Sequence, residues 1–274
     1  MQPVEFCKMS GCGNDFILVD NRTPVIDEGD LEQFVAALCR RGSSVGADGL
    51  ILIESSEDLD FQWRFFNSDG SRAEMCGNGA RCAARYAFLN RIAPAEMTFG
   101  TDVGPLQARI IGEDVKLKMP RPKSLRLAET LSVDGKDLTV SAIDTGVPHV
   151  VLTVDDLPGT DVVSLGRAIR NHDHYAPEGT NVNFLGPLAD HTLAIRTYER
   201  GVEQETLACG TGAVAGTLIT ACKENLDGPL NIRTQSGKIL QVHFKRQGER
   251  FQDVYLQGEA RLVYHGRLTP EAWS

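Results

Sequence analysis

Two short stretches of the chain repeat one pattern of cysteine, glycine and alanine. "CGNGA" begins at Cys76 and "CGTGA" begins at Cys209, and each precedes a run that predicts a helix. A thiol at a helix N-terminus lies beside the positive end of the helix dipole and beside unpaired backbone N–H groups. Such a position lowers a thiol pKa from about 8.5 into a range of about 3.5–7.5. We therefore expect both thiols to be usable as bases or nucleophiles near neutral pH.

The duplication of this turn indicates what the thiols do. A single cysteine beside glycine is more often a small core residue, but a pair can serve both faces of one carbon. If one group is thiolate and the other thiol, the first removes a proton α to a carboxylate and the second protonates the opposite face, which inverts the centre. Backbone N–H groups would stabilise the carbanion at the carboxylate, and we assign this role to Gly77, Asn78, Gly210 and Thr211. This scheme requires no metal or cofactor, and we expect none.

Composition and charge restrict the class of ligand. The chain has 274 residues and a formal net charge of -9, and its basic residues are scattered. Phosphate binding needs clustered Lys and Arg, so we expect a small-molecule substrate and no nucleic acid. The start of the chain has no signal-peptide pattern, and no run approaches the roughly 20 apolar residues of a membrane helix. We expect a cytoplasmic protein without a membrane partner.

The remaining cysteines suggest packing rather than chemistry. Seven cysteines form an odd set, which disfavours a disulfide framework. A zinc site is disfavoured because no C-x-x-C pair exists and no histidine has ligand spacing from the cysteines. We expect Cys39, Cys82 and Cys222 to be buried core thiols.

The order of predicted elements indicates an α+β fold. Short strands rich in Val, Ile, Leu and Phe follow one another directly, so the sheets should be mainly antiparallel. The stretches that predict helices are Asp30–Arg41, Gly77–Arg91, Ser164–His172 and Gly210–Asn225. The helices after the two cysteines carry few or no charges, so each should lie buried inside a curled sheet.

The two halves repeat one unit of strand, turn, cysteine and helix. We therefore predict two similar domains related by pseudo-two-fold symmetry, each a curled sheet around a central helix, with the active site in the cleft between them. The stretch "KMPRPKSLRLAET", residues 118–130, is the best linker candidate. We place the first domain at 1–119, with 263–274 returning to it, and the second at 120–262.

Several longer motifs span almost the whole chain, among them "KMSGCGNDFILVDN", "FFNSDGSRAEMCGNGARCAARY", "GVPHVV", "GTNVNF" and "RTYERGVEQETLACGTGAVA". In these motifs the sequence resembles the diaminopimelate epimerase family of cofactor-independent isomerases. The resemblance implies interconversion of LL- and meso-2,6-diaminopimelate in the biosynthesis of lysine and peptidoglycan precursors. It also implies two mirrored halves and a homodimer.

The resemblance extends to individual residues. It implies that Cys76 and Cys209 are the acid/base thiols, and that His149 and Glu199 help to position them. The positions that match the substrate contacts of the family are Asn14, Asn67, Gly77, Asn78, Asn181, Glu199, Arg200, Gly210 and Thr211. Arg200 suits the distal carboxylate of a substrate with an amino-acid group at both ends. The chain departs from the family pattern at Gly49 and Val147, where many members have Gln and Asn.

Other functions remain open at this point. The nearest is an epimerase or racemase of the same superfamily that acts on histidine, proline or hydroxyproline. An isomerase that uses a carboxylate lacks the paired thiols, so Cys76 and Cys209 count against it. In a thiol redox protein the two cysteines would form a working disulfide, and oxidation would then not inactivate it.

Overall fold

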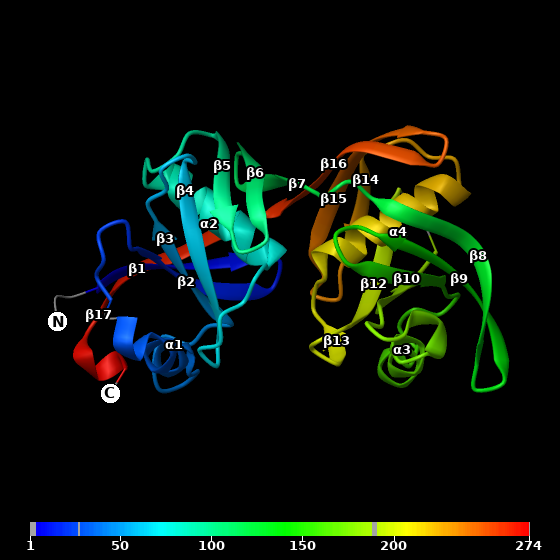
Figure 1. Ribbon diagram of the computed structural model, residues 1–274, viewed down its shortest axis with the longest axis horizontal. Coiled ribbons are helices and arrows are strands. Elements are labelled where there is room, and N and C mark those ends of the chain that lie inside the picture. The colour runs from blue at the N-terminus through cyan, green and yellow to red at the C-terminus, as the bar shows by residue number, and fades with distance from the viewer. Residues whose placement is uncertain (1–3, 27, 188–190, 274) are drawn as a thin grey trace. The chain divides into compact units, whose positions relative to one another are not determined.

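The computed structural model describes residues 4–26, 28–187 and 191–273 and shows an α+β chain (Figure 1). The chain divides into two compact units: unit 1 comprises Met1–Leu117 and Gly258–Ser274, and unit 2 comprises Lys118–Gln257. The α-helices of the described residues are α1 (Leu31–Cys39), α2 (Gly77–Leu89), α3 (Val162–Arg170) and α4 (Gly210–Lys223). Short 3-10 helices are η1 (Glu28–Asp30), η2 (Asp173–Tyr175) and η3 (Pro270–Ala272). The four predicted helices are confirmed.

The strands of unit 1 pair in the order β17-β1-β2-β3-β4-β5-β6-β7. Neighbours are antiparallel, except that β2 pairs with β3 and β4 with β5 in parallel. The strands are β1 (Val4–Gly11), β2 (Asn14–Asp20), β3 (Gly49–Glu54), β4 (Phe61–Asn67), β5 (Glu96–Thr101), β6 (Gly104–Ile111), β7 (Asp114–Lys118) and β17 (Arg261–Leu268). The C-terminal strand β17 therefore completes a sheet that begins at the other end of the chain.

The strands of unit 2 pair in the order β8-β9-β10-β11-β12-β14-β15-β16. Here β10 pairs with β11 and β12 with β14 in parallel, and the other neighbours are antiparallel. The strands are β8 (Lys123–Val133), β9 (Lys136–Asp144), β10 (Pro148–Thr153), β11 (Asn181–Leu185), β12 (Thr192–Glu199), β13 (Gln204–Thr206), β14 (Leu230–Arg233), β15 (Ile239–Gln247) and β16 (Arg250–Glu259). The short strand β13 pairs with the end of β12.

The two units are built on one pattern. In each, eight strands follow one another with parallel pairs at the same two places. A parallel pair needs a crossover connection, and the crossovers contain α1 and α2 in unit 1 and α3 and α4 in unit 2. The predicted internal duplication, with a mainly antiparallel sheet in each half, is confirmed.

Helices α2 and α4 lie within the cores of their units. Helix α2 contacts β1, β2, β3 and β6, and α4 contacts β9, β10, β11, β12, β14 and β15, so each sheet curls around its helix. Alanines 80, 83, 84 and 87 of α2 are fully buried, and their small side chains let Phe61, Trp63 and Phe99 pack against the helix. Even Arg81 is 0% exposed. The predicted burial of both helices is confirmed.

Both central helices end two residues before the predicted end. Arg91 has φ 58° and Asn225 has φ 53°, and this left-handed backbone cannot continue a right-handed helix. Helix α2 therefore ends at Leu89 and α4 at Lys223. Helix α3 begins earlier than predicted because Asp161 caps it by accepting a hydrogen bond from the Ser164 N–H at 3.0 Å.

The stretch predicted as a linker is mostly a strand. Residues 119–122 lie outside regular structure, but β8 begins at Lys123 and pairs with β9. Its buried and exposed positions alternate toward its end, as expected for a strand with one covered face. Left-handed residues Ser124 and Ala128 fall at the two register shifts of this pairing.

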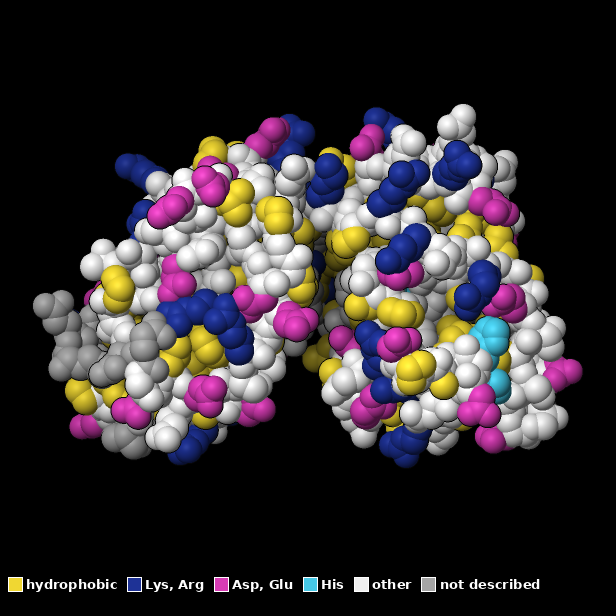
Figure 2. All heavy atoms as spheres, viewed as in Figure 1, with side chains coloured by type: hydrophobic (Ala, Val, Ile, Leu, Met, Phe, Trp, Pro, Cys, Tyr) yellow, Lys and Arg dark blue, Asp and Glu magenta, His cyan; other side chains and the backbone are white. Residues whose placement is uncertain are grey.

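The surface of each unit mixes charges of both signs. On the face in Figure 2, Lys and Arg side chains stand among Asp and Glu side chains on both units. Among the described residues, no helix combines the length and the apolar character that crossing a membrane requires.

Candidate functional site

Cys76 and Cys209 occupy the same position in equivalent helices. Each is the N-cap residue, with extended backbone of φ -146° and -112°, and the next residue begins α2 or α4. The first helical hydrogen bonds run from Ala80 N–H to the Cys76 carbonyl and from Ala213 N–H to the Cys209 carbonyl. Helix geometry therefore leaves the N–H groups of residues 77–79 and 210–212 without a partner inside the helix, as an anion site requires.

The two thiols differ in their immediate contacts. The Cys76 side chain is half-buried, and its Sγ accepts a hydrogen bond from the Gly79 N–H at 3.4 Å. The Cys209 side chain is buried, and its Sγ lies 3.5 Å from the Thr211 hydroxyl. The Cys76 sulfur thus caps its own helix, whereas the Cys209 sulfur lies beside a hydroxyl.

The second glycine of each turn permits close packing beneath the helix. A Cβ atom at Gly212 would lie 2.3 Å from Asn183 Oδ1 and 3.3 Å from Cys209 Sγ. At the equivalent Gly79, a Cβ atom would lie 3.2 Å from Ile51 Cδ1. Only glycine allows the backbone of α4 to approach Asn183 so closely.

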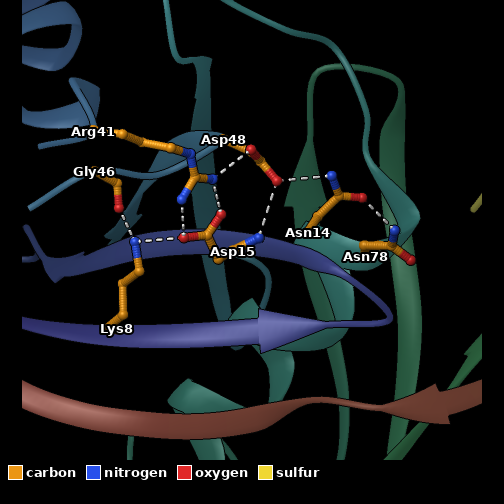
Figure 3. Close-up of polar contacts among 7 residues, drawn as sticks. All are labelled: Lys8, Asn14, Asp15, Arg41, Gly46, Asp48 and Asn78. Carbon is orange, nitrogen blue, oxygen red and sulfur yellow. Dashed lines mark hydrogen bonds and ion pairs between the residues drawn. The ribbon is translucent and has the colours of Figure 1, made fainter. Parts of the chain in front are cut away.

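In unit 1, Asn14 and Asn78 lie together beside the first turn of α2 (Figure 3). Asn78 Nδ2 donates to Asn14 Oδ1 at 2.7 Å, and Asn14 Nδ2 donates to Asp48 Oδ2 at 2.9 Å. At the other end, Arg81 Nη2 donates to Asn78 Oδ1. The structure therefore joins two predicted substrate contacts to two charged residues that the sequence did not single out.

Asp48 belongs to a cluster of charges at the starts of β2 and β3. Arg41 donates to Asp48 Oδ1 at 2.8 Å and also pairs with Asp15, and Lys8 pairs with Asp15 at 2.7 Å (Figure 3). Burial alone would raise the pKa of Asp15, but hydrogen bonds and charge from Arg41 and Lys8 hold it below its usual value. Asp15 therefore remains ionised near neutral pH.

Asn67 lies apart from this row of amides. It ends β4, is exposed, and donates from Nδ2 to the Ser71 hydroxyl at 3.1 Å across the turn that leads to Cys76. Its cross-strand neighbour is Gly49, where the family pattern commonly has Gln. A Cβ atom at Gly49 would lie 2.4 Å from the Phe66 carbonyl oxygen, so this backbone has no room for a side chain there.

In unit 2, Asn181 joins two of the loops that carry predicted site residues. Its Nδ2 donates to the Pro148 carbonyl at 3.1 Å, and its Oδ1 accepts from the Arg200 N–H at 2.9 Å. The Arg200 guanidinium donates to the Glu178 carbonyl at 3.2 Å. Glu199 accepts from the Thr206 hydroxyl at 2.9 Å, and burial raises the pKa of its carboxyl despite this bond.

His149 is held by a residue that the sequence analysis missed. Asn183 Nδ2 donates to His149 Nδ1 at 3.1 Å and to the Val150 carbonyl at 2.9 Å, and the Thr197 hydroxyl donates to Asn183 Oδ1 at 3.0 Å. Because Nδ1 accepts, the neutral imidazole carries its proton on Nε2. That Nε2 is buried and has no partner among the described residues.

Burial keeps His149 in this neutral form. It lowers the pKa of the imidazole from 6.5 to about 3, with a smaller contribution from the Arg200 charge. The sequence did carry a signal for Asn183, since "NVNF" in a strand places the Asn181 and Asn183 side chains on one face.

The other cysteines are weak candidates for chemistry. Burial raises the pKa of Cys7 and Cys39 to about 11, and it also raises the pKa of Cys12, Cys82 and Cys222. Cys39 and Cys82 are buried, as predicted. The prediction was wrong for Cys222, which is only half-buried because it lies in the last turn of α4.

Comparison with known proteins gives one consistent result. A sequence profile described as "Diaminopimelate epimerase" matches residues 6–124 and 141–263. The diaminopimelate epimerase of Aquifex aeolicus is 43% identical over 98% of this chain and 99% of its own length.

Solved structures show where the fold recurs. A phenazine biosynthesis protein of the PhzF family from Bacillus anthracis is 17% identical and superimposes with a TM-score of 0.73, covering 98% of this chain and 100% of its own. A hydroxyproline epimerase from Agrobacterium vitis is 14% identical, with a TM-score of 0.66 and coverage of 99% and 95%.

Proposed function

The chain belongs to the diaminopimelate epimerase family, and from this premise we propose that Cys76 and Cys209 are the acid/base pair with which it interconverts LL- and meso-2,6-diaminopimelate. The protein is an isomerase, and its substrate is a small molecule. The observation that carries the assignment of the pair is their equivalent placement as N-cap residues of α2 and α4.

The proposed reaction moves two protons. A thiolate at one helix N-terminus removes the α-proton, and the thiol at the other delivers its own proton to the opposite face of the carbon. Each turnover exchanges the roles of the two sulfurs, so the reverse reaction uses the same groups. Both sulfurs must reach the same α-carbon during catalysis.

The carbanion needs stabilisation because no cofactor is proposed to delocalise its charge. The first-turn N–H groups of Gly77 and Asn78 in α2, and of Gly210 and Thr211 in α4, suit an α-carboxylate on which negative charge accumulates. Donors that are already fixed by the helix need no reorganisation as this charge develops.

We propose that polar side chains around the thiols recognise the rest of the substrate. Arg200 binds the distal carboxylate, and Asn14, Asn67, Asn78, Asn181 and Glu199 bind the remaining ammonium and carboxylate groups. His149 and Glu199 position or poise the thiols. The raised pKa of Glu199 and the neutral His149 support roles in which their protonation differs from that of exposed side chains.

The proposal also covers the location, the oligomeric state and the domain boundaries of the protein. We propose a cytoplasmic homodimer in the biosynthesis of lysine and peptidoglycan precursors, with epimerase halves at 1–119 plus 263–274 and at 120–262. Sedimentation of the purified protein tests the oligomeric state directly.

A substrate assay tests the function. The purified protein is incubated in deuterated water with LL-diaminopimelate and, separately, with proline, hydroxyproline and histidine, and incorporation of α-deuterium is followed by NMR. We expect exchange and formation of the meso isomer with diaminopimelate, and no exchange with the amino acids that have a single α-centre. Exchange of proline or histidine without exchange of diaminopimelate would contradict the proposed substrate.

A further inference from the structure

The amides of Asn14 and Asn78 form one hydrogen-bonded row, and Figure 3 shows it together with its accepting end at Asp48. Arg81 donates to Asn78, Asn78 donates to Asn14, and Asn14 donates to Asp48. We propose that Asp48 and Arg81 are positioning residues that fix both amides in one orientation, so that Asn14 and Asn78 present N–H groups to a substrate carboxylate. This inference rests on the proposed function of the two asparagines as substrate contacts.

The ends of the row determine its direction. An Asn amide has an accepting end and a donating end of nearly the same shape, so its partners decide which end faces which way. A guanidinium only donates, and an ionised carboxylate only accepts. Reversing either amide would therefore place two donors or two acceptors against each other at Arg81 or at Asp48.

Asp48 is held firmly enough to act as the accepting end. Its Oδ2 accepts from the Asp15 N–H at 3.2 Å as well as from Asn14, and its Oδ1 accepts from Arg41 at 2.8 Å. Arg41 is anchored in turn by Asp15. These contacts orient both oxygens of the Asp48 carboxylate.

Arg81 is an unusual donating end because it is fully buried. Its Nε lies 3.5 Å from the Glu259 carbonyl, and its Nη1 has no hydrogen-bond partner among the described residues. A buried charge is costly unless opposite charge approaches it. A substrate carboxylate bound to Asn78 would bring negative charge next to this cation.

The N–H groups that the row does not use are suited to bind a carboxylate. Each amide nitrogen carries two N–H groups, and one of each pair is used within the row. Within the part of the chain that the structure describes, one N–H group of Asn14 and one of Asn78 remain without a partner. Asn78 also contributes a backbone N–H in the first turn of α2, so side chain and backbone of the same residue can donate to one anion.

The decisive variants alter the hydrogen bond between Asn14 and Asp48. The single variant removes its acceptor, and the double variant exchanges donor and acceptor. In Asp48→Asn, Arg41 attracts the new amide oxygen and the amide nitrogen faces Asn14. Asn14 must then either oppose this nitrogen with its own or turn over and oppose the nitrogen of Asn78, which Arg81 holds in place. We expect kcat/KM for LL-diaminopimelate to fall about 10- to 100-fold, mainly through KM, as for the loss of hydrogen bonds to a charged group. The double variant Asn14→Asp with Asp48→Asn restores a bond between positions 14 and 48 and keeps the net charge.

The double variant separates positioning from structural support. It should regain part of the thermal midpoint lost in Asp48→Asn but not the KM of the unaltered protein, because position 14 now presents only acceptors to the substrate. Recovery of KM in the double variant would show that only the bond mattered, and would overturn the proposal. An unchanged KM in Asp48→Asn would overturn it as well.

A matched control makes the same charge change at the other end of β3. Glu54 is a half-buried carboxylate that pairs with Arg64 at 2.6 Å and accepts from Asn21 at 2.8 Å, outside the row and the cluster around Asp48. Glu54→Gln should lower the thermal midpoint while KM stays close to that of the unaltered enzyme; a rise in KM equal to that of Asp48→Asn would contradict the proposal. Inactivity of the unaltered protein toward diaminopimelate would instead refute the proposed function, and the proposal with it.

Discussion

The starts of α2 and α4 share a backbone frame but differ in what lies beneath them. Ile51 in β3 pairs with Phe65, and Asn183 in β11 pairs with Thr197, at equivalent places of the two sheets. Ile51 lies under Gly79, and Asn183 lies under Gly212. One thiol therefore begins a helix above an apolar core, and the other above a buried polar network. The duplicated backbone determines where the thiols lie, while the side chains below make the two sites chemically different.

The largest expected effect tests what the two regions share. Cys76→Ala and Cys209→Ala should each lower kcat by about 100- to 10,000-fold, because each removes one proton-handling group. Steady-state kinetics on both substrate isomers measures this loss. Cys82→Ala is the control, since this buried thiol of α2 should affect stability without loss of kcat. Equal inactivation of folded Cys82→Ala would refute our division of the cysteines.

The second prediction compares alanine substitutions at the two equivalent glycines, Gly79 and Gly212. Gly212→Ala forces a Cβ atom against Asn183 and should cost about 1–3 kcal/mol of unfolding free energy, with a loss of activity as Cys209 shifts. Gly79→Ala meets the flexible end of Ile51 at 3.2 Å and makes ordinary contacts with Cys76 and Trp63 at 3.6 Å, so it should cost less. Urea unfolding of both variants provides the comparison, and equal losses would show that the packing beneath the helices does not differ as described.

The third prediction concerns the pH dependence of stability. It involves His149, which belongs to the buried polar network beneath α4. The pKa of His149 is about 3 in the folded chain against 6.5 for the free side chain, so below pH 6.5 the unfolded chain binds a proton that the folded chain does not. Stability is therefore lost as pH falls from 6.5 toward 3, by up to about 1.4 kcal/mol per pH unit.

The variant His149→Gln isolates this contribution. The slope of unfolding free energy against pH between 6.5 and 4.5 should be smaller in the variant than in the unaltered protein. Asp15, with its lowered pKa, loses its stabilisation only below its usual value of 3.8, and Glu199, with its raised pKa, acts in the opposite direction. Identical slopes would mean that His149 is not buried as a neutral group.

The smallest expected effect sharpens the description of the polar network. Thr197→Val removes the hydroxyl that donates to Asn183 and should cost about 1 kcal/mol through one unsatisfied acceptor. Thermal unfolding measures the change. Thr153→Val, at an exposed position in β10, is the matched control and should leave the midpoint nearly unchanged. A similar midpoint in both variants would indicate that Asn183 does not depend on Thr197.

The sequence predicted the helices and the positions of the two thiols better than the polar contacts around them. Cys76 and Cys209 could be placed at helix N-termini because a glycine turn followed by an apolar run is a local pattern. Residues 118–130 predict a linker because they include two prolines and several basic residues, whereas the strand β8 among them is defined by its pairing with β9.

The supporting residues of the site depend on contacts between distant segments. Asp48 lies 34 residues from Asn14, and Asn183 lies 34 residues from His149, so only the sheet pairings bring them together. Arg81 has no functional signal in the sequence, and its contact with Asn78 appears only in the folded structure. Local patterns identify reactive groups, whereas tertiary structure identifies what orients them.

The origin of the proton in the product tests the two-base mechanism most directly. The purified protein is given LL-diaminopimelate in deuterated water, and the α-deuterium of substrate and product is measured in the first few per cent of conversion. We predict deuterium in the meso product and almost none in the remaining substrate, because one sulfur takes the substrate proton while the other delivers deuterium from solvent. Equal early labelling of substrate and product would indicate a single base and contradict the assignment of Cys76 and Cys209 as a pair.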